Sequence, residues 1–172
     1  MKDIMEGEML LRHWISRVGA SMGFRVVSVM AVWVFLFTAI STEAVRLPQF
    51  YADMAEASKI KATAVVTSVE IIERTKRSTS KKVVFELRHS FSDSVPATFS
   101  GTCYSVDHSW QEPGAGGTIY HYPKKGQKVY VTISADGGSI TSYTAIDEAL
   151  EGMFIENPGK IRYGMGKAYL EK

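Results

Sequence analysis

The longest apolar stretch of the chain lies near its N-terminus, where residues 26–40 read VVSVMAVWVFLFTAI without a charged side chain. As a helix this run would span about 22 Å, which is shorter than the roughly 30 Å of a hydrocarbon core. Extending the helix back to Val18 gives about 34 Å. The pattern therefore predicts a transmembrane helix over residues 18–42. Arg25 falls inside it, and its long side chain would reach towards the nearer lipid head groups.

Two other interpretations of this stretch are open. A buried core helix is disfavoured, because apolar side chains such as Trp33 surround the whole helix, and such a helix needs lipid or a very large core. A cleaved signal peptide is the stronger alternative, since the run has the length of an h-region. However, the long segment before it begins with Asp3, Glu6 and Glu8 rather than with basic residues. We therefore expect an anchor that is not removed.

Basic residues on either side of the predicted helix indicate its orientation. They are slightly more frequent before the run than just after it, which by the positive-inside rule favours a cytoplasmic N-terminus. We expect a single-pass protein of the inner membrane whose C-terminal domain lies in the periplasm. Apolar residues recur at helical spacing in the cytoplasmic tail, residues 1–17, which predicts an amphipathic helix on the inner surface or against another subunit.

Small residues near the start of the predicted membrane helix form the pattern Gly19-x-x-x-Gly23. This spacing lets two helices approach closely, although glycine is also tolerated at a membrane boundary without that role. The candidate contact residues of the membrane segment are Gly19, Gly23, Arg25 and Trp33.

From Ala62 onwards the apolar period changes from that of a helix to that of a strand. Val65, Thr67, Val69 and Ile71 are expected on one face of the first strand. Residues 83–91 show the clearest alternation of apolar and polar positions. Further strands, with Gly101 as a bulge in the first of them, are predicted over residues 97–106, 118–122, 129–133 and 139–143.

Helical spacing is found on both sides of these strands. Pro48 suits the first turn of a short helix over residues 48–60. Thr144 and Asp147 resemble a capping box, which predicts a helix over residues 145–154. Residues 160–172 are partly apolar but show no clear period.

Together these patterns predict a mainly β protein with some α-helix. Its parts are a single N-terminal transmembrane helix, a small antiparallel β barrel or sandwich of five or six strands, and a short C-terminal helix. The expected division is a tail (1–17), a transmembrane helix (18–42), a linker helix (43–61), a β domain (62–143), and a C-terminal helix with its tail (144–172).

Four segments of the β region carry a recurring pattern: ATAVV at 62–66, VVFEL at 83–87, GTCY at 101–104 and GQKVYV at 126–131. With them, residues 62–143 resemble an uncharacterised bacterial family of small membrane-anchored proteins with an extracytoplasmic β domain. The resemblance implies an architecture and no activity. Members of that family often have a further membrane helix after the domain, and no comparable apolar run follows residue 143 here.

The charge of the chain is balanced, with a formal net charge of +2 and 22% charged residues. This balance offers no basic groove for nucleic acid. One segment departs from it, the loop RTKRSTSKK at residues 74–82. Arg74, Lys76 and Arg77 are candidates to bind anionic lipid or an acidic partner, unless the loop is only a solvated hairpin tip.

Aromatic residues flank the glycine-rich segment at residues 113–117. Trp110 and Tyr120 are therefore candidate anchors of a protein interface, because large aromatic side chains in loops often contribute most of the binding energy. The alternative is that they cap the core of the β domain.

Metal-binding and catalytic patterns are weak. Cys103, His108 and His121 have the spacing C-x4-H-x12-H, whereas structural zinc usually has four ligands in closer pairs. The single cysteine excludes an intrachain disulfide, and we expect a buried, unreactive thiol. Neither G-x-S-x-G nor a phosphate-binding loop is present. We therefore expect no metal site, no cofactor and no catalytic residue.

These expectations favour an accessory subunit of a larger membrane complex, for example a bacterial respiratory or photosynthetic assembly. Its partners would be other membrane subunits and the bilayer. The alternative is a stand-alone module of the cell envelope that binds lipid, glycan or peptide.

Overall fold

The part of the chain that can be described is the region after the predicted membrane helix. The computed structural model describes residues 48–114 and 117–171, which belong to one compact unit. Within these ranges no helix has the length and apolar character needed to cross a bilayer. The predicted tail and transmembrane helix lie outside the described residues, together with the contact residues expected there: Gly19, Gly23, Arg25 and Trp33.

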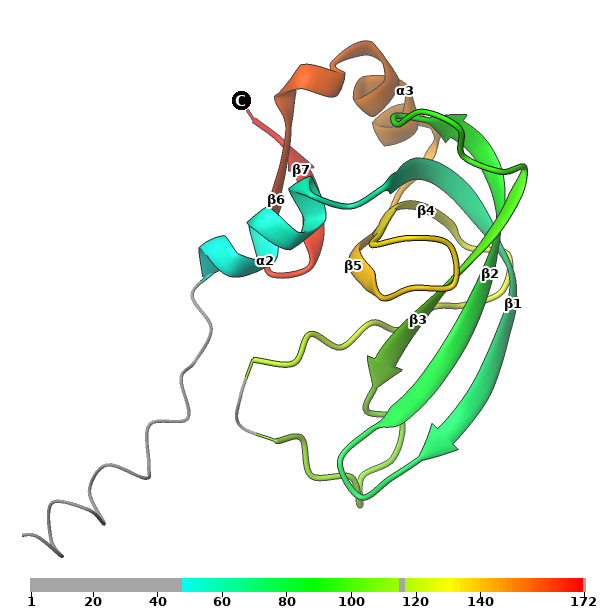
Figure 1. The fold of residues 1–172 in the computed structure, drawn as a ribbon, viewed down its shortest axis with the longest axis vertical. Helices are drawn as coiled ribbons and strands as arrows, with labels where there is room; N and C mark the ends of the chain where they lie inside the picture. The colour runs from blue at the N-terminus through cyan, green and yellow to red at the C-terminus, as the bar shows by residue number, and fades with distance from the viewer. Residues whose placement is uncertain (1–47, 115–116, 172) are drawn as a thin grey trace, which may run out of the picture. The chain divides into compact units, whose positions relative to one another are not determined.

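A five-stranded antiparallel sheet in the order β3-β2-β1-β4-β5 forms the centre of the fold (Figure 1). Its strands are β1 (Ile60–Arg74), β2 (Thr79–Ser90), β3 (Thr98–Ser105), β4 (Lys128–Ile133) and β5 (Ile140–Ala145). A two-stranded sheet and short helices complete the described part: α2 (Pro48–Glu56), α3 (Glu148–Glu156), the 3-10 turn η1 (Pro158–Lys160), β6 (Ile161–Gly164) and β7 (Lys167–Leu170). The prediction of a mainly β protein with some helix is confirmed.

The long strand β1 is bent by bulges. It pairs with β2 along most of its length, but its pairing with β4 involves only Ile60–Val65. Thr67 and Ile72 are extra residues opposite β2, and each shifts the register. These shifts break the predicted shared face of Val65, Thr67, Val69 and Ile71. At the start of the strand Ala62, Ala64 and Val66 are buried, whereas Val65 and Thr67 are only half-buried.

The two edges of the five-stranded sheet meet. Isolated parallel bridges join Thr102 to Ser139 and Tyr104 to Tyr120, and the Thr102 amide donates to the Gly138 carbonyl at 2.8 Å. The expected strand over residues 118–122 is thus reduced to a single bridge at Tyr120.

Gly101 has a different role from the predicted one. The pairing of β2 with β3 has no register shift there, so the predicted bulge is wrong. A Cβ on Gly101 would lie 2.8 Å from Cγ1 of Ile140, which is closer than side-chain carbons approach. Glycine is needed because β5 packs directly against the backbone of β3.

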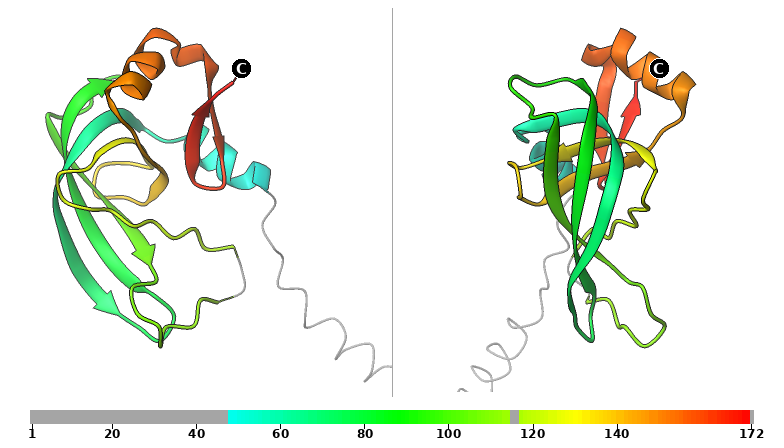
Figure 2. Two further views of the ribbon diagram at one scale, coloured as in Figure 1. Left: turned by 180° about the vertical axis from the view of Figure 1, so that it is seen from behind. Right: turned by 90° about the vertical axis from the view of Figure 1, so that its right-hand side faces the viewer.

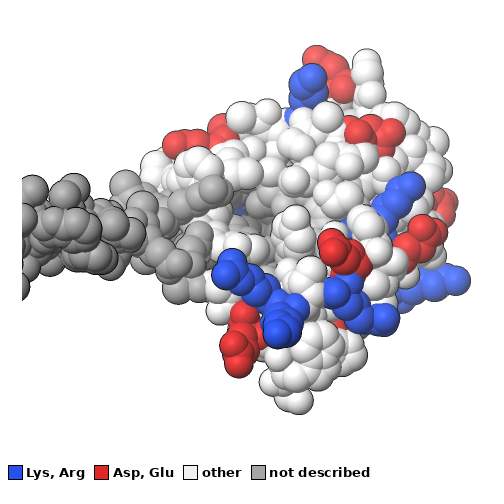
Figure 3. All heavy atoms as spheres, turned by 60° about the horizontal axis from the view of Figure 1, so that its bottom comes forward, with Lys and Arg blue, Asp and Glu red and all other residues white. Residues whose placement is uncertain are grey.

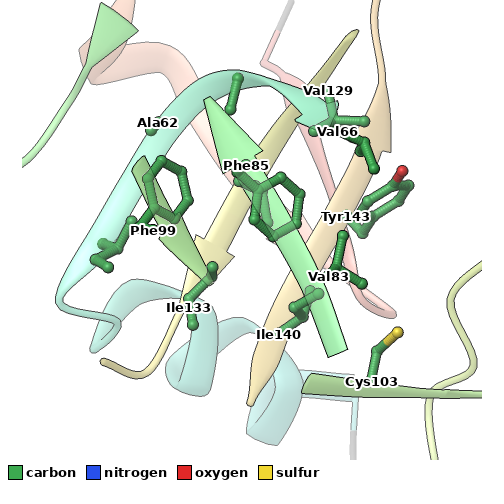
Figure 4. Packing of buried hydrophobic residues seen from close by; sticks show 13 residues of the cluster. Ala62, Val66, Val83, Phe85, Phe99, Cys103, Val129, Ile133, Ile140 and Tyr143 are labelled. Atoms are coloured by element: carbon green, nitrogen blue, oxygen red, sulfur yellow. The ribbon is translucent and has the colours of Figure 1, made fainter. Parts of the chain in front are cut away.

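The main core fills the inside of the curved sheet (Figure 4). Phe85 and Phe99 stack with their ring centroids 5.3 Å apart, and both are almost completely buried. Burial of one such side chain stabilises a fold by about 1.5–3 kcal/mol. Figure 4 shows further members of this core: Val66, Val83, Val129, Ile133, Ile140 and Tyr143.

A second core lies on the other face of β4, where Tyr130 is fully buried. Its hydroxyl shares a hydrogen bond with that of Tyr163 at 2.8 Å, and its ring lies 4.9 Å from that of Phe154. The helices and the β6–β7 hairpin gather beside this half of the sheet (Figure 2). Both faces of β4 are therefore buried, unlike those of an ordinary alternating strand.

The C-terminal helix begins later than predicted. Asp147 is the N-cap of α3, and its carboxylate accepts a hydrogen bond from the Leu150 amide at 2.8 Å. Thr144 is not part of a capping box, because its hydroxyl accepts from the Ala168 amide at 2.7 Å and so joins β5 to β7. Residues expected to be an irregular tail form the β6–β7 hairpin instead.

Glu151 holds α3 against the sheet. Its side chain is buried, accepts from the Thr63 hydroxyl at 2.8 Å and pairs with the Lys128 ammonium at 2.8 Å. Burial raises the pKa of Glu151, but the hydrogen bonds from Lys128 and Thr63 outweigh it and leave the pKa below its usual value. The carboxylate is therefore ionised where the helix meets β1 and β4.

Glu151→Ala is expected to lower the free energy of unfolding by about 1–3 kcal/mol, because it leaves the buried Thr63 hydroxyl without its acceptor. Glu148→Ala is the matched control. It also removes a partner of Lys128, but Glu148 is exposed to solvent, so we expect a loss within about 0.5 kcal/mol. Urea denaturation measures both values, and equal losses would contradict the role given to Glu151.

Candidate functional site

The loop after β3 is fastened to the tip of the β1–β2 hairpin by Gln111. The side chain of Gln111 is buried, and its amide donates to the Thr75 carbonyl at 3.2 Å and to the Thr79 hydroxyl at 3.0 Å. Its carbonyl oxygen accepts from the amides of Asp107 at 2.8 Å and His108 at 3.2 Å. The two N–H donors of this amide join the loop to the hairpin, and its carbonyl oxygen closes a turn within the loop.

Two further contacts strengthen this junction. The Glu112 amide donates to the Lys76 carbonyl at 2.8 Å, and Lys81 forms an ion pair with Asp107 at 2.8 Å. Burial raises the pKa of Asp107, but the hydrogen bond and the charge of Lys81 help to offset it, and the pKa is lowered overall. The loop is thus held in place by both neutral and charged hydrogen bonds.

We define the tip surface by six exposed side chains at this end of the molecule: Ile71, Ile72, Arg74, Lys76, Arg77 and Trp110. The exposed fractions of Ile72 and Trp110 are 58% and 55%, although both are large and apolar. Figure 3 brings this end of the molecule forward and shows Lys and Arg side chains gathered on it, with Asp and Glu among them. The tip surface therefore combines apolar, aromatic and cationic groups on ordered backbone.

Trp110 is held by a neighbour rather than free to rotate into solvent. Its ring stacks on that of His108, with the centroids 5.3 Å apart and the planes 9° from parallel. The Arg77 guanidinium lies beside Gly114. A Cβ added to Gly114 would be 3.8 Å from Nη1 of Arg77. Arg77 on the hairpin and Trp110 on the loop are thus both exposed next to the junction that Gln111 forms.

The structure brings most of the predicted contact residues of the β domain together. Arg74, Lys76, Arg77 and Trp110 belong to the tip surface, whereas Tyr120 lies at the bridge to β3 and lines a different hollow. Sequence reasoning missed Ile71 and Ile72 as surface residues, since Ile71 was only placed on one face of a strand with Val65, Thr67 and Val69. The available signal was two adjacent isoleucines between Glu70 and Glu73, which interrupts the alternation.

Around Tyr120 and His121 the surface is hollowed. One hollow of about 310 Å³ is lined by Tyr120, His121, Tyr143 and Lys167 among others. A more enclosed one of about 90 Å³ is lined by Cys103 and His121 among others. The structure therefore places these two residues on one hollow, while His108 stacks on Trp110.

The chemistry of these two side chains is set by burial. Burial lowers the pKa of His121 to about 4, against the usual 6.5, so the imidazole is neutral at pH 7. Burial likewise raises the pKa of the Cys103 thiol to about 11, which keeps it protonated. Among residues 48–114 and 117–171, no group of three or more His, Cys, Asp or Glu side chains is arranged to hold a metal ion.

Gln111→Ala is expected to release the loop from the hairpin and to lower the free energy of unfolding by about 1–3 kcal/mol, because it leaves the buried Thr79 hydroxyl and backbone groups unpaired. Amide hydrogen exchange should rise most at residues 107–112. Gln49→Ala serves as the control, since Gln49 makes an exposed hydrogen bond to Asp53. Unchanged exchange in the loop of Gln111→Ala would refute the junction.

The low pKa of His121 predicts acid sensitivity. The unfolded state binds a proton near pH 6.5 but the folded state only near 4, so the contribution of His121 to stability is complete above 6.5 and falls as the pH drops towards 4. The loss is about 3 kcal/mol. His121→Gln should remove this part of the pH dependence of the free energy of unfolding, whereas His108→Gln should retain it. If the free energy of unfolding of wild type and of His121→Gln changed with pH in the same way, His121 would not be the source of the acid sensitivity.

Comparison with known proteins gave no match. Neither a protein-family model, nor a curated protein, nor a solved structure is similar to the chain at a significant level. The resemblance of residues 62–143 to the family of small bacterial membrane-anchored proteins therefore stays a prediction. The tip surface and the hollows are therefore the features from which the function of the chain is inferred.

Proposed function

We propose that this chain is a non-catalytic accessory subunit of a larger membrane protein complex, for example a bacterial respiratory or photosynthetic assembly. It would be anchored in the inner membrane by a single helix over residues 18–42, with its N-terminus in the cytoplasm and its β domain in the periplasm. The observation that carries the proposal is the tip surface, an ordered set of exposed apolar, aromatic and cationic side chains.

The composition of the tip surface supports a protein partner. Interfaces between proteins are rich in Trp and Arg around an apolar centre, and a few such residues contribute most of the binding energy. Here Trp110 and Ile72 supply the apolar part, and Arg77 supplies the cationic part. The junction through Gln111 orders the loop in advance, which lowers the entropic cost of binding.

An anionic bilayer fits this surface less well. Segments that bind anionic lipid usually carry clusters of four to eight Lys and Arg residues. The hairpin loop has five, but Lys81 is paired with Asp107. The tip surface instead has acidic residues close by: Glu70, Glu73 and Glu112. The mixed charge favours a protein surface with its own charges of both signs.

The predicted anchor would assist this docking. A domain tethered beside its partner by a membrane helix binds at a high effective concentration, so a small interface is sufficient. Gly19 and Gly23 would permit close packing of that helix on a partner helix, with Arg25 and Trp33 near it. The proposal needs no cofactor, catalytic residue or nucleic acid.

We also propose that the five-stranded sheet is a small, partly closed barrel. The support is the parallel bridge from Thr102 in β3 to Ser139, the residue before β5, which joins the two edges of the sheet. Joining the edges removes unpaired strand groups that would otherwise favour aggregation.

The proposal predicts that Trp110→Ala releases the protein from its complex. After extraction of the full chain in mild detergent, the wild type should migrate with fixed partner subunits on native sizing. Trp110→Ala should weaken that association at least about tenfold, a loss of 1.4 kcal/mol or more. Ile72→Ser should act in the same direction.

Met153→Ser is the matched control, because Met153 is a similarly exposed apolar residue on α3. It should leave the association unchanged. A wild-type chain that migrates alone would contradict the proposal. Binding to vesicles of anionic lipid, unchanged by Trp110→Ala, would instead support the alternative of a stand-alone envelope module.

A further inference from the structure

The bridge between β3 and the loop before β4 brings Cys103 and His121 to the inside of the fold. Tyr104 is bridged to Tyr120 in parallel, and the His121 amide donates to the Tyr104 carbonyl at 2.8 Å. Because side chains alternate along paired segments, the neighbours of these tyrosines point to the opposite, inner face. The small exposed fractions of the two side chains, 4% for Cys103 and 6% for His121, agree with this inward direction.

His121 has a free ring nitrogen. Within the described part of the chain, the Nε2 atom of its imidazole is buried and has no hydrogen-bond partner. With the proton of the neutral imidazole on Nδ1, the Nε2 lone pair is available to bind a ligand.

The hollow between them has room for a small ligand. Cys103 and His121 both line it, together with Ser80, Thr102 and Ser139 among others, and its volume is about 90 Å³. One water takes up about 30 Å³ in the liquid, so an ion with one or two waters would fit. The site is thus small and largely enclosed, and it offers one sulfur and one nitrogen.

We propose that Cys103 and His121 form a two-ligand site for a soft monovalent metal ion, Cu(I) or Ag(I). On binding, the Cys103 thiol releases its proton to solvent and its sulfur bonds the ion. The Nε2 lone pair of His121 forms the second bond. No electron is transferred. The ion brings one positive charge and one proton leaves, so the filled site is neutral, as the empty site was.

The ligand set favours such an ion over zinc. Zinc sites in proteins normally have four ligands, or three with an open position, whereas Cys103 and His121 supply two. Thiolate is a soft ligand that selects Cu(I). Because each ion displaces one thiol proton, the apparent affinity should rise about tenfold per pH unit below the thiol pKa of about 11. This inference is independent of the proposed function, since the tip surface does not include either residue.

Titration of the full-length chain with Ag(I), a redox-inert probe, tests the site. We expect one equivalent to bind and to raise the Tm. Cys103→Ala should abolish this binding, and His121→Gln should weaken it at least tenfold although it keeps the thiol. His108→Gln, a change of an exposed histidine, should bind as the wild type does.

Nitrogen NMR of the wild-type imidazole gives a second readout that does not depend on the folding of a variant. Addition of Ag(I) should shift the His121 Nε2 resonance and leave that of His108 in place. Equal affinity of wild type and His121→Gln would overturn the proposal and indicate a thiol that binds alone. An unshifted Nε2, or binding only after the chain unfolds, would overturn it as well.

Discussion

The described fold depends on β1, which has to serve two neighbours at once. Its first half is hydrogen-bonded to both β2 and β4, while its second half is paired with β2. Register shifts with β2 at Thr63/Ala64 and at Thr67 bend the strand here. The curvature encloses the core around Phe85 and Phe99, and it also directs the hairpin tip away from the helices (Figure 1).

The same curvature brings the edges of the sheet together and creates the interior hollow. Gly101 leaves space for Ile140, so that the turn between β4 and β5 can hydrogen-bond to β3. The neighbouring bridge at Tyr104 then brings His121 to the hollow that Cys103 also lines. Burial makes both groups neutral, because transfer of a charge into this interior would be costly.

The end of the hairpin shows how a buried polar residue can support an exposed surface. Gln111 is enclosed and fully hydrogen-bonded, whereas its neighbour Trp110 is more than half exposed. The cost of burying the amide is offset by its four hydrogen bonds. As a result, an apolar and cationic surface is presented on a loop that would otherwise lose considerable entropy on binding.

The sequence by itself determined the elements whose signal is local. Alternation over residues 83–87 and 129–133 predicted β2 and β4, Pro48 marked the start of α2, and the basic loop was recognised as a hairpin end. The cap of α3 at Asp147 and the β6–β7 hairpin are local contacts too, but these segments are too short to show a clear period. Tertiary structure alone decided the inner face of β1, the junction of two segments through Gln111, and the hollow that Cys103 and His121 share. These features rest on contacts between residues far apart in the chain, and the period of a segment contains no information about such partners.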